Sequence, residues 1–479
     1  MHLLTKEHRA LLYLITFVAL FRLLVAPHMG LGVDEAHYLL YAMNLDWSYF
    51  DHPPLVGWTH YLFTSLFGLD AFGARISAIL IGFVTSIFLY QFLYSIDNNA
   101  RLAFIAVLAL HGVFIFNALF LMLMPDTLLF LLILPLIFTL RALQETKSAK
   151  HYLLLGLLLG LAGLSKYTAV LFIPPIILYF LIKKRYELFL SWKVLLTFFA
   201  AFILVLPVFL WNIQNNWISF AYQSDHVVAS KILNLKGFGA SLTAQFFAYN
   251  PFLSPLAFYG LYRAIRSKND TLFLAALFGG VLFLFFTYSS LYKTALPHWS
   301  ALFYMLFIPL GVYFLYENSL LWRRYLKFAI GFGLLLSTLI YIEVATKIIP
   351  LPNIGSLHVD MYGFSSINAR ANAHIKNPKN EAIAVTHWTL GARTIFENKT
   401  YDSEVYLLDD RYDQFDIWQK NSPLGLDLII IDFPFTHKNL QEYLKCESFT
   451  FLEAFHLLAT TEGEKKIELY RCTNYQGLK

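Results

Sequence analysis

Acidic and histidine side chains are concentrated early in the chain, in the stretch LGVDEAHYLLYAMNLDWSYFDHPPLVGW at residues 31–58. Its first acidic pair is Asp34-Glu35. A carboxylate held beside an electrophile can act as the base that deprotonates a hydroxyl group, so we assign this catalytic role to Asp34, with Glu35 next to it. The alternative is that Asp34 only caps the helix that follows, because Asp is a preferred N-cap residue.

The second pair, Asp51-His52, directly precedes two prolines that fix the backbone. Asp51 together with a distant imidazole, such as that of His226, could bind a divalent metal ion, although two ligands alone form a weak site. A protonated His52 could instead contact a phosphate group. For each histidine the alternative is a hydrogen-bonded residue at a membrane interface, so the requirement for a metal remains open.

Three further charged residues are candidates for substrate binding. Lys166 stands between two apolar runs, where an ammonium group would be a fixed positive partner for a lipid-linked phosphate. The alternative is that its side chain extends to the membrane surface. Asp126 follows a proline and either caps the next helix or pairs with Lys166. Arg75 either pairs with Asp34 or contacts the phosphate itself.

The composition predicts an integral membrane protein. Hydrophobic residues make up 58% of the 479 residues and charged residues only 14%, whereas about 25% of the residues of a soluble domain are charged. The net charge of +5 is small and dispersed, and no basic helix alternates with aromatic residues, so we expect no nucleic-acid partner. The motifs GxxxxGK[ST], GxGxxG, HExxH and GxSxG are missing, which disfavours ATP hydrolysis, dinucleotide redox chemistry, zinc proteolysis and serine hydrolysis. We therefore expect a substrate that is delivered by lipid.

The apolar segments suffice for eleven membrane spans, at about 20 residues for each crossing. The segment 102–140 is too long for one span and is divided at Met124–Asp126. The segment 151–184 is short for two spans, but basic residues flank both ends, so it must cross and return with Ser165-Lys166 at its apex. The expected spans are 11–26, 72–94, two within 102–140, two within 151–184, 194–210, 251–262, 271–288, 299–315 and 328–345.

Basic residues predict the orientation, because cytoplasmic loops are enriched in Lys and Arg. Sixteen of them fall in the loops assigned to the inside and four in the loops assigned to the outside. The N-terminus is therefore expected in the cytoplasm and the C-terminus outside it. This topology places the candidate residues near the outer membrane face, mainly in loops at about 27–71 and 212–250. Several ionisable groups at similar depth indicate a shared water-filled cavity.

The composition changes near residue 346. Residues 1–346 are expected to form the transmembrane domain, and residues 347–479 a small extracytoplasmic α/β domain. EAIAVTHW and LDLIIIDFPF have the pattern of buried strands, and TLGARTIFE and HKNLQEYLK that of helices. Cys446 and Cys472 both lie in this domain, where an oxidising compartment permits a disulfide. The alternative is a pair of buried free thiols.

Several of these motifs resemble the GT-C superfamily of membrane glycosyltransferases, and within it the bacterial branch related to protein O-mannosyltransferases and lipid A aminoarabinose transferases. The similar segments are DEAHYLLYAMNLDWSYFDHPPLVGW, FGARISAIL, MPDTLLFLL, GLLLGLAGLSKYTAVLF and VTHWTLGARTIF…RYDQFDIW. The Asp-Glu pair followed by Asp-His-Pro-Pro is the specific part of the resemblance.

The resemblance implies a multi-pass enzyme of the bacterial cytoplasmic membrane. It would transfer a sugar, with inversion, from a polyprenyl-phosphate-linked donor to a hydroxyl group of a lipid A, glycan or protein acceptor. Asp34 would be the catalytic base, and Asp51 and His226 match positions that can hold a metal. Lys166 aligns with a basic residue of the cavity, whereas His52 stands where the aminoarabinose transferases have a lysine near the donor phosphate.

The sequence leaves two alternatives to an active glycosyltransferase. A transporter or flippase of a lipid-linked sugar would need functional charges near the bilayer midplane and an internal repeat, and we find neither. An inactive homologue would keep its function when Asp34 is replaced by Asn. In the C-terminal domain His387, Trp388 and Arg393 either cover the substrate or serve the fold.

Overall fold

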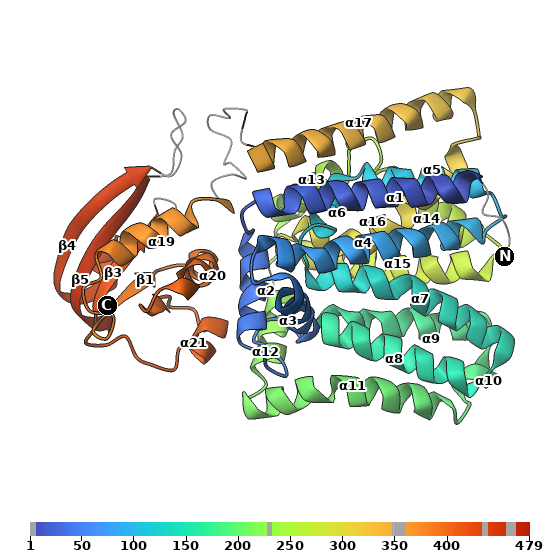
Figure 1. The fold of residues 1–479 in the computed structure, drawn as a ribbon. Helices are drawn as coiled ribbons and strands as arrows, with labels where there is room; N and C mark the ends of the chain where they lie inside the picture. Colours follow the sequence, from blue (N-terminus) through green and yellow to red (C-terminus); the bar gives the residue numbers. More distant parts are fainter. Residues whose placement is uncertain (1–5, 228–231, 347, 349–360, 434–438, 457–465) are drawn as a thin grey trace. The chain divides into compact units, whose positions relative to one another are not determined.

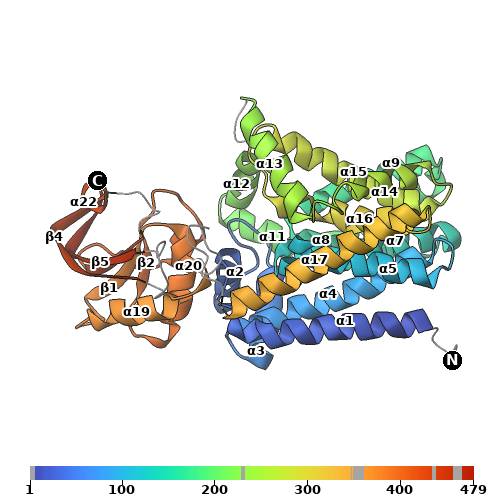
Figure 2. The same ribbon diagram turned by 90° about the horizontal axis from the view of Figure 1, so that it is seen from above.

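The computed structural model describes residues 6–227, 232–346, 348, 361–433, 439–456 and 466–479, with the backbone alone at 225–227 (Figures 1 and 2). Contacts between residues divide the chain into two units. The transmembrane unit comprises Met1–Ala26, Asp46–Gly68 and Phe72–Tyr341, and the C-terminal unit comprises Pro27–Leu45, Leu69–Ala71 and Ile342–Lys479. The main division is close to the boundary expected from the sequence, but part of the first loop groups with the C-terminal unit.

Long apolar helices of the transmembrane unit run roughly parallel to one another in both views (Figures 1 and 2). Within the described residues, seven helices are long and apolar enough to cross a membrane. They are α1 (Lys6–Val25), α4 (Ala71–Tyr94), α7 (Pro125–Thr146), α11 (Val194–Gln214), α15 (Asp270–Ser290), α16 (Ala301–Leu315) with the preceding turn η3 (Pro297–Ser300), and α17 (Leu320–Thr346). The chain is therefore a multi-pass membrane protein, as its composition predicts.

Shorter apolar helices occupy the other expected spans. They are α5 (Ala100–His111), α8 (Ala149–Ser165), η2 (Tyr167–Phe172) with α9 (Ile173–Ile182), and α14 (Leu256–Arg266); the small helices α6 (Phe114–Leu119) and α10 (Tyr186–Phe189) lie between them. Every expected span thus contains a helix in the described part of the chain. These shorter helices do not reach the about 20 residues of a full crossing, so the number of eleven spans stays a prediction.

Glycines let neighbouring helices of the transmembrane unit approach closely. A Cβ atom at Gly156 of α8 would lie 2.4 Å from the carbonyl oxygen of Thr197 in α11, and one at Gly311 of α16 would lie 2.2 Å from that of Leu256 in α14. Both distances are far below van der Waals contact, so only glycine fits. Small residues are the usual means of helix packing in lipid, where apolar burial gives little driving force. This packing fixes α8, which ends next to Lys166.

The loops that carry candidate residues contain helices of their own. The first loop forms η1 (Ala26–His28), α2 (Val33–Met43) and α3 (Leu55–Phe67), and the later loop forms α12 (Ile218–Val227) and α13 (Leu235–Ala248). Pro54 is the N-cap of α3. The two prolines after His52 therefore start a helix, as expected from their fixed backbone angle.

A mixed sheet forms the centre of the C-terminal unit. Within the described residues it has five strands, β1 (Glu381–Val385), β2 (Val405–Leu407), β3 (Asp427–Asp432), β4 (Leu444–His456) and β5 (Lys466–Leu478), in the order β2-β1-β3-β5-β4. β1 pairs in parallel with β2 and β3, whereas β5 pairs antiparallel with β3 and β4. The connecting helices are α19 (Phe364–Ala373), α20 (Trp388–Glu397) with η4 (Asn398–Thr400), α21 (Gln414–Trp418) and α22 (Leu440–Tyr443).

The sequence predicts the central part of this unit correctly. EAIAV forms β1, DLIIID forms β3, and TLGARTIFE lies in α20. The helix expected at HKNLQEYLK is confirmed only over Leu440–Tyr443, which forms the one-turn helix α22; residues 437–438 lie outside the described residues, and β4 begins at Leu444. A disulfide joins Cys446 of β4 to Cys472 of β5. The bridge is therefore confirmed, and the alternative of free thiols is wrong.

Candidate active site

Asp34 and Glu35 lie in the first turn of α2. The N-cap of this helix is Gly32, and the Glu35 carboxylate accepts a hydrogen bond of 3.1 Å from the backbone N–H of Gly32. Glu35 is buried and satisfies one of the backbone donors that a helix start leaves without an intrahelical partner. The alternative that Asp34 is the cap is therefore wrong.

An aromatic cluster fixes α2 within the C-terminal unit. The buried ring of His37, one turn after Asp34, has five aromatic rings around it at centroid distances of 5.1–6.2 Å. These rings belong to Tyr38 and Tyr41 of α2, Trp388 of α20, and Phe415 and Trp418 of α21. The carboxylate assigned as the base therefore stands on a helix that packs against the C-terminal α/β fold.

His387, Trp388 and Arg393 have structural roles in this unit. The ring of His387 caps α20 by accepting a hydrogen bond of 3.3 Å from the backbone N–H of Thr389. Trp388 packs against His37 in the aromatic cluster. The guanidinium carbon of Arg393 lies 4.2 Å from the centroid of the Phe364 ring. These contacts agree with the interpretation that the three residues serve the fold.

Asp126 and Lys166 form a buried ion pair in the transmembrane unit. The Lys166 ammonium nitrogen lies 2.7 Å from both carboxylate oxygens of Asp126. The exposed fraction is 7% for the Asp126 side chain and 9% for the Lys166 side chain. Asp126 is in the first turn of α7, whose N-cap is Met124, and Lys166 follows the last residue of α8. Asp126 therefore pairs with Lys166 and is not the cap of α7. The buried Lys166 side chain does not extend to the membrane surface.

Two histidines add to the electrostatic environment of this pair. The Lys166 ammonium contacts the Asp126 carboxylate, and the His298 and His52 side chains are near enough for a positive charge on either ring to act on it. His52 comes from the first loop, and His298 from the turn η3 that precedes α16. One carboxylate, one ammonium and two imidazoles thus gather at the ends of apolar helices. When an imidazole is protonated, this group carries a net positive charge that suits a phosphate.

The backbone around Asp51 is held by α12. The Ser219 hydroxyl donates a hydrogen bond of 2.9 Å to the Tyr49 carbonyl oxygen, and the Gln223 amide donates one of 2.7 Å to the Asp51 carbonyl oxygen. The Ser48 and Tyr167 hydroxyl oxygens lie 3.2 Å apart, which joins the same turn to the residue after Lys166. The turn before His52 is therefore tied to α12 and to the residue that follows Lys166.

A metal site is not formed by the described residues, among which no three His, Cys, Asp or Glu side chains come together as ligands. His226 lies in α12, one turn after Gln223, but its side chain lies outside the described residues. The metal pair Asp51–His226 therefore stays a prediction. With these donors alone the site does not fit a tightly bound ion.

Arg75 is fully buried at the start of α4, and its Nη1 donates a hydrogen bond of 2.6 Å to the Ala26 carbonyl oxygen. Its role toward a phosphate or toward Asp34 stays a prediction. Sequence reasoning missed a second buried guanidinium, that of Arg22 in α1. Arg22 donates to the Tyr341 hydroxyl at 3.2 Å and to the Asn117 side-chain oxygen at 2.9 Å. An arginine inside an apolar span was the available signal, because such residues are costly in lipid.

The structure thus brings together Asp126 and Lys166, with His52 within electrostatic reach of Asp126. Asp34 and Glu35 belong to the C-terminal unit, whereas the other candidates belong to the transmembrane unit. His298 was also missed, although a histidine directly before the apolar run of α16 was a usable signal.

These features define a multi-pass membrane protein with ionisable groups at helix ends and a C-terminal α/β domain. The family model described as dolichyl-phosphate-mannose-protein mannosyltransferase matches residues 51–211. The fold is similar to that of ArnT from Cupriavidus metallidurans in crystal structures bound to undecaprenyl phosphate (TM-score 0.68, 16% identity) and in the apo state (TM-score 0.66, 15% identity). Each comparison covers 96% of this chain and 97% of the other.

A curated relative is the lipid A galacturonosyltransferase RgtD of Rhizobium johnstonii, which is 25% identical over 247 residues. The match covers 50% of this chain and 50% of the relative, so the chain spans about half the length of that protein. Together the matches confirm the fold class and the resemblance to GT-C glycosyltransferases related to O-mannosyltransferases and ArnT.

Proposed function

We propose that this protein transfers a sugar from a polyprenyl-phosphate-linked donor to an acceptor hydroxyl group, with inversion at the anomeric carbon. The observation that carries the proposal is the buried Asp126–Lys166 pair with His52 and His298 in electrostatic reach. Charged groups are costly among apolar helices and usually serve a substrate there. The donor class is supported by the undecaprenyl phosphate bound to ArnT, and a lipid A acceptor by the relative RgtD.

The chemical step is a single displacement. Asp34 takes the proton of the acceptor hydroxyl group while the hydroxyl oxygen attacks the anomeric carbon on the side opposite the phosphate. The bond between the anomeric carbon and the phosphate oxygen breaks, and its electron pair goes to that oxygen. Polyprenyl phosphate leaves with one more negative charge, and the configuration at the anomeric carbon is inverted. Correct alignment of the two reactants supplies a large part of the rate.

Lys166, His52 and Arg75 stabilise the negative charge that develops on the phosphate. An ammonium group has three N–H donors, and the Asp126 carboxylate engages Lys166 through both of its oxygens. The remaining donor direction is available to a phosphate oxygen. Asp126 therefore holds Lys166 in place, and a protonated imidazole of His52 supplies positive charge that the ion pair alone lacks.

We propose a topology with the N-terminus in the cytoplasm and the C-terminal unit outside the bacterial inner membrane. The disulfide between Cys446 and Cys472 supports this orientation, because structural disulfides form and persist mainly in oxidising compartments. Acceptors delivered to the outer face, such as lipid A, another glycan or a protein, then meet the base on the same side of the membrane.

Two experiments test the proposal. Mass spectrometry of the envelope glycolipids with and without the gene should show the loss of one sugar from an acceptor.

Replacement of Asp34 by Asn should lower the transfer rate by about 10²- to 10⁴-fold, the usual contribution of a general base. The matched control is Asp70→Asn, which removes an exposed carboxylate of the same loop and should leave the rate unchanged. Full activity in Asp34→Asn protein that is folded would exclude Asp34 as the base.

A further inference from the structure

The C-terminal unit contains a cavity of about 340 Å³ beside the C-terminal end of α2. This volume is at the small end of the range for ligand pockets, which is about 300–1,000 Å³. The cavity is bordered by α2, α20, β2 and α21, all of which belong to the same unit. None of its lining residues is a candidate for phosphate binding, and the mechanism described above does not use it.

The residues that line this cavity are of two kinds, apolar and polar. The apolar part is formed by Leu40, Ile395, Tyr406, Phe415 and Trp418. Leu40, Tyr406 and Phe415 are buried, and Trp418 is half-buried. The polar part is formed by Asn44, Glu404, Gln419, Lys420 and Asn421. An apolar and aromatic surface bordered by a few polar groups is the usual composition of a small-molecule site.

The polar groups are positioned by bonds to the surrounding fold. The Glu404 carboxylate accepts hydrogen bonds from the Tyr406 hydroxyl and, at 3.2 Å, from the Asn421 amide. The Gln419 side-chain oxygen accepts one of 2.7 Å from the backbone N–H of Leu407 in β2. These contacts fix one carboxylate and two amide side chains among the lining residues of the cavity, which also include Trp418. Hydroxyl groups of a ligand can use further lone pairs of such a carboxylate.

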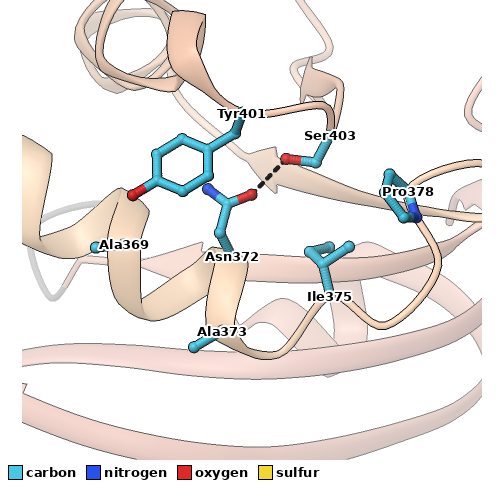
Figure 3. Close-up of a pocket in the computed structure, with 7 residues that line it drawn as sticks. All are labelled: Ala369, Asn372, Ala373, Ile375, Pro378, Tyr401 and Ser403. Atoms are coloured by element: carbon cyan, nitrogen blue, oxygen red, sulfur yellow. Dashed lines mark hydrogen bonds between the residues drawn. The ribbon is translucent and has the colours of Figure 1, made fainter.

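A second cavity in the same unit offers a contrast. It has about 360 Å³ and is lined by residues that include Asn372, Tyr401 and Ser403 (Figure 3). Its polar groups bind one another: Ser403 donates to the Asn372 side-chain oxygen at 2.5 Å, and the Asn372 amide donates to Asn398 at 2.8 Å. Figure 3 shows the Asn372–Ser403 bond directly. No charged side chain is among its lining residues, and its one amide is bound to neighbouring side chains, so this cavity serves as the internal comparison.

The position of the first cavity relative to Asp34 is set by α2. Leu40 and Asn44 follow Asp34 by six and ten residues, which corresponds to about 9 and 15 Å along a helix at 1.5 Å per residue. A short saccharide can span this separation. A ligand in the cavity would therefore lie within reach of the base without occupying the reacting position.

We propose that this cavity binds a sugar ring of the acceptor, next to the ring that carries the reacting hydroxyl group. This assignment of the cavity rests on the proposed sugar transfer, and it adds that the acceptor is a carbohydrate. A pyranose has an apolar C–H face that packs on an aromatic ring such as Trp418, and hydroxyl groups at its edge that bind amides and carboxylates. Lys420 adds one exposed positive charge at the rim, which suits a phosphorylated saccharide.

Binding of a defined probe tests this assignment. The probe is deacylated lipid A, a phosphorylated glucosamine disaccharide, titrated against the full chain in lipid nanodiscs. Trp418→Leu keeps apolar volume but removes the ring, and should weaken binding by about fivefold to tenfold. Asn421→Ala removes an edge amide and should weaken it by about threefold to tenfold. Tyr401→Leu, the matched change at the second cavity, should leave the affinity unchanged.

The outcomes separate this inference from the proposed function. Asp34→Asn should bind the probe as the wild type does while losing transfer. Absence of saturable binding to the wild type, or equal affinity of the Trp418, Asn421 and Tyr401 variants, would overturn the assignment of the cavity even if sugar transfer is observed. Retained transfer in Asp34→Asn would overturn the mechanism and leave the cavity result standing.

Discussion

At the level of single residues, the Asp126–Lys166 pair connects stability with the proposed chemistry. Both side chains are buried, and each ammonium–carboxylate distance is 2.7 Å. Removal of one partner leaves an uncompensated buried charge. Asp126→Asn should therefore lower the free energy of unfolding by about 3–5 kcal/mol, measured from thermal unfolding of the solubilised full chain. Glu145→Gln, which breaks the exposed pair with Arg141, should cost no more than about 0.5 kcal/mol.

The double variant Asp126→Asn/Lys166→Met distinguishes the two roles of this pair. It removes both charges, so part of the stability lost in the single variant should return. Transfer activity should stay low, because the ammonium group assigned to the phosphate is also gone. Recovery of activity together with stability would show that the pair serves only the fold.

Asp413 provides a pH-dependent prediction in the C-terminal unit. It is the N-cap of α21 and accepts a hydrogen bond of 2.8 Å from the backbone N–H of Phe415. Burial raises the pKa of its carboxyl group from 3.8 to about 6, and the negative charge of Asp416 adds to the effect. The unfolded chain therefore loses this proton first as the pH rises. Stability should fall between about pH 4 and pH 6, by up to about 3 kcal/mol, and then level off.

Asp413→Asn isolates that contribution, because Asn keeps the capping oxygen but does not titrate. Its unfolding temperature should equal that of the wild type near pH 4 and exceed it above pH 6. The difference between the two pH profiles removes the contribution of all other titrating groups. Profiles that stay parallel from pH 4 to pH 7.5 would show that the carboxyl group has its ordinary pKa.

The sequence shows which residues are unusual for their surroundings, but it does not show which partners they contact. Lys166 and Asp126 stand out because charges are rare in apolar runs, and their pairing was one of two expected alternatives. The Tyr341 partner of Arg22, and the rings of α20 and α21 that surround His37, come from segments hundreds of residues away. Such contacts depend on tertiary packing, which no local pattern encodes. Gly32, and not Asp34, is the N-cap of α2, because the Glu35 carboxylate accepts a hydrogen bond from the backbone N–H of Gly32.

At the level of elements, helices within apolar runs were predicted well and the outer strands were not. Burial of β1 and β3 gives short, continuous apolar runs that are easily recognised. β4 is mostly exposed or half-buried, β5 alternates between buried and half-buried residues, and in both strands apolar residues alternate with polar ones. That alternation, in SFTFLEAFH and KIELYRC, was a usable signal for strands. The helix expected at residues 437–445 was too long at its C-terminal end, because Leu444 and Lys445 pair with β5 as the first residues of β4.

The disulfide gives a prediction for this hairpin. Cys446 and Cys472 are 26 residues apart and join the neighbouring strands β4 and β5. Replacing both by Ala should lower the free energy of unfolding by about 2–4 kcal/mol, since the unfolded chain gains freedom when the loop is no longer closed. Reduction of the wild type should produce a similar loss in a thermal unfolding experiment. Alkylation of both cysteines without prior reduction would contradict the bridge.

At the level of the whole molecule, the chain does not divide at a single point. Residues 27–45 of the first loop make their contacts with the C-terminal unit, although they precede most of the transmembrane helices. The base proposed here is thus carried by the C-terminal unit, and the phosphate-binding groups by the transmembrane unit. Under this proposal, the groups for the donor phosphate and the base for the acceptor hydroxyl belong to different units.

This division requires that the C-terminal unit lie outside the cytoplasm, which fusion proteins can test. Alkaline phosphatase joined after Lys479 should be active, because it needs an oxidising compartment for its disulfides. The matched control is a fusion within the loop Tyr316–Ser319, between α16 and α17, which basic residues at Arg323 and Arg324 assign to the cytoplasm. That fusion should be inactive. The opposite pattern would place Asp34 on the cytoplasmic side and exclude an acceptor that is glycosylated at the outer face.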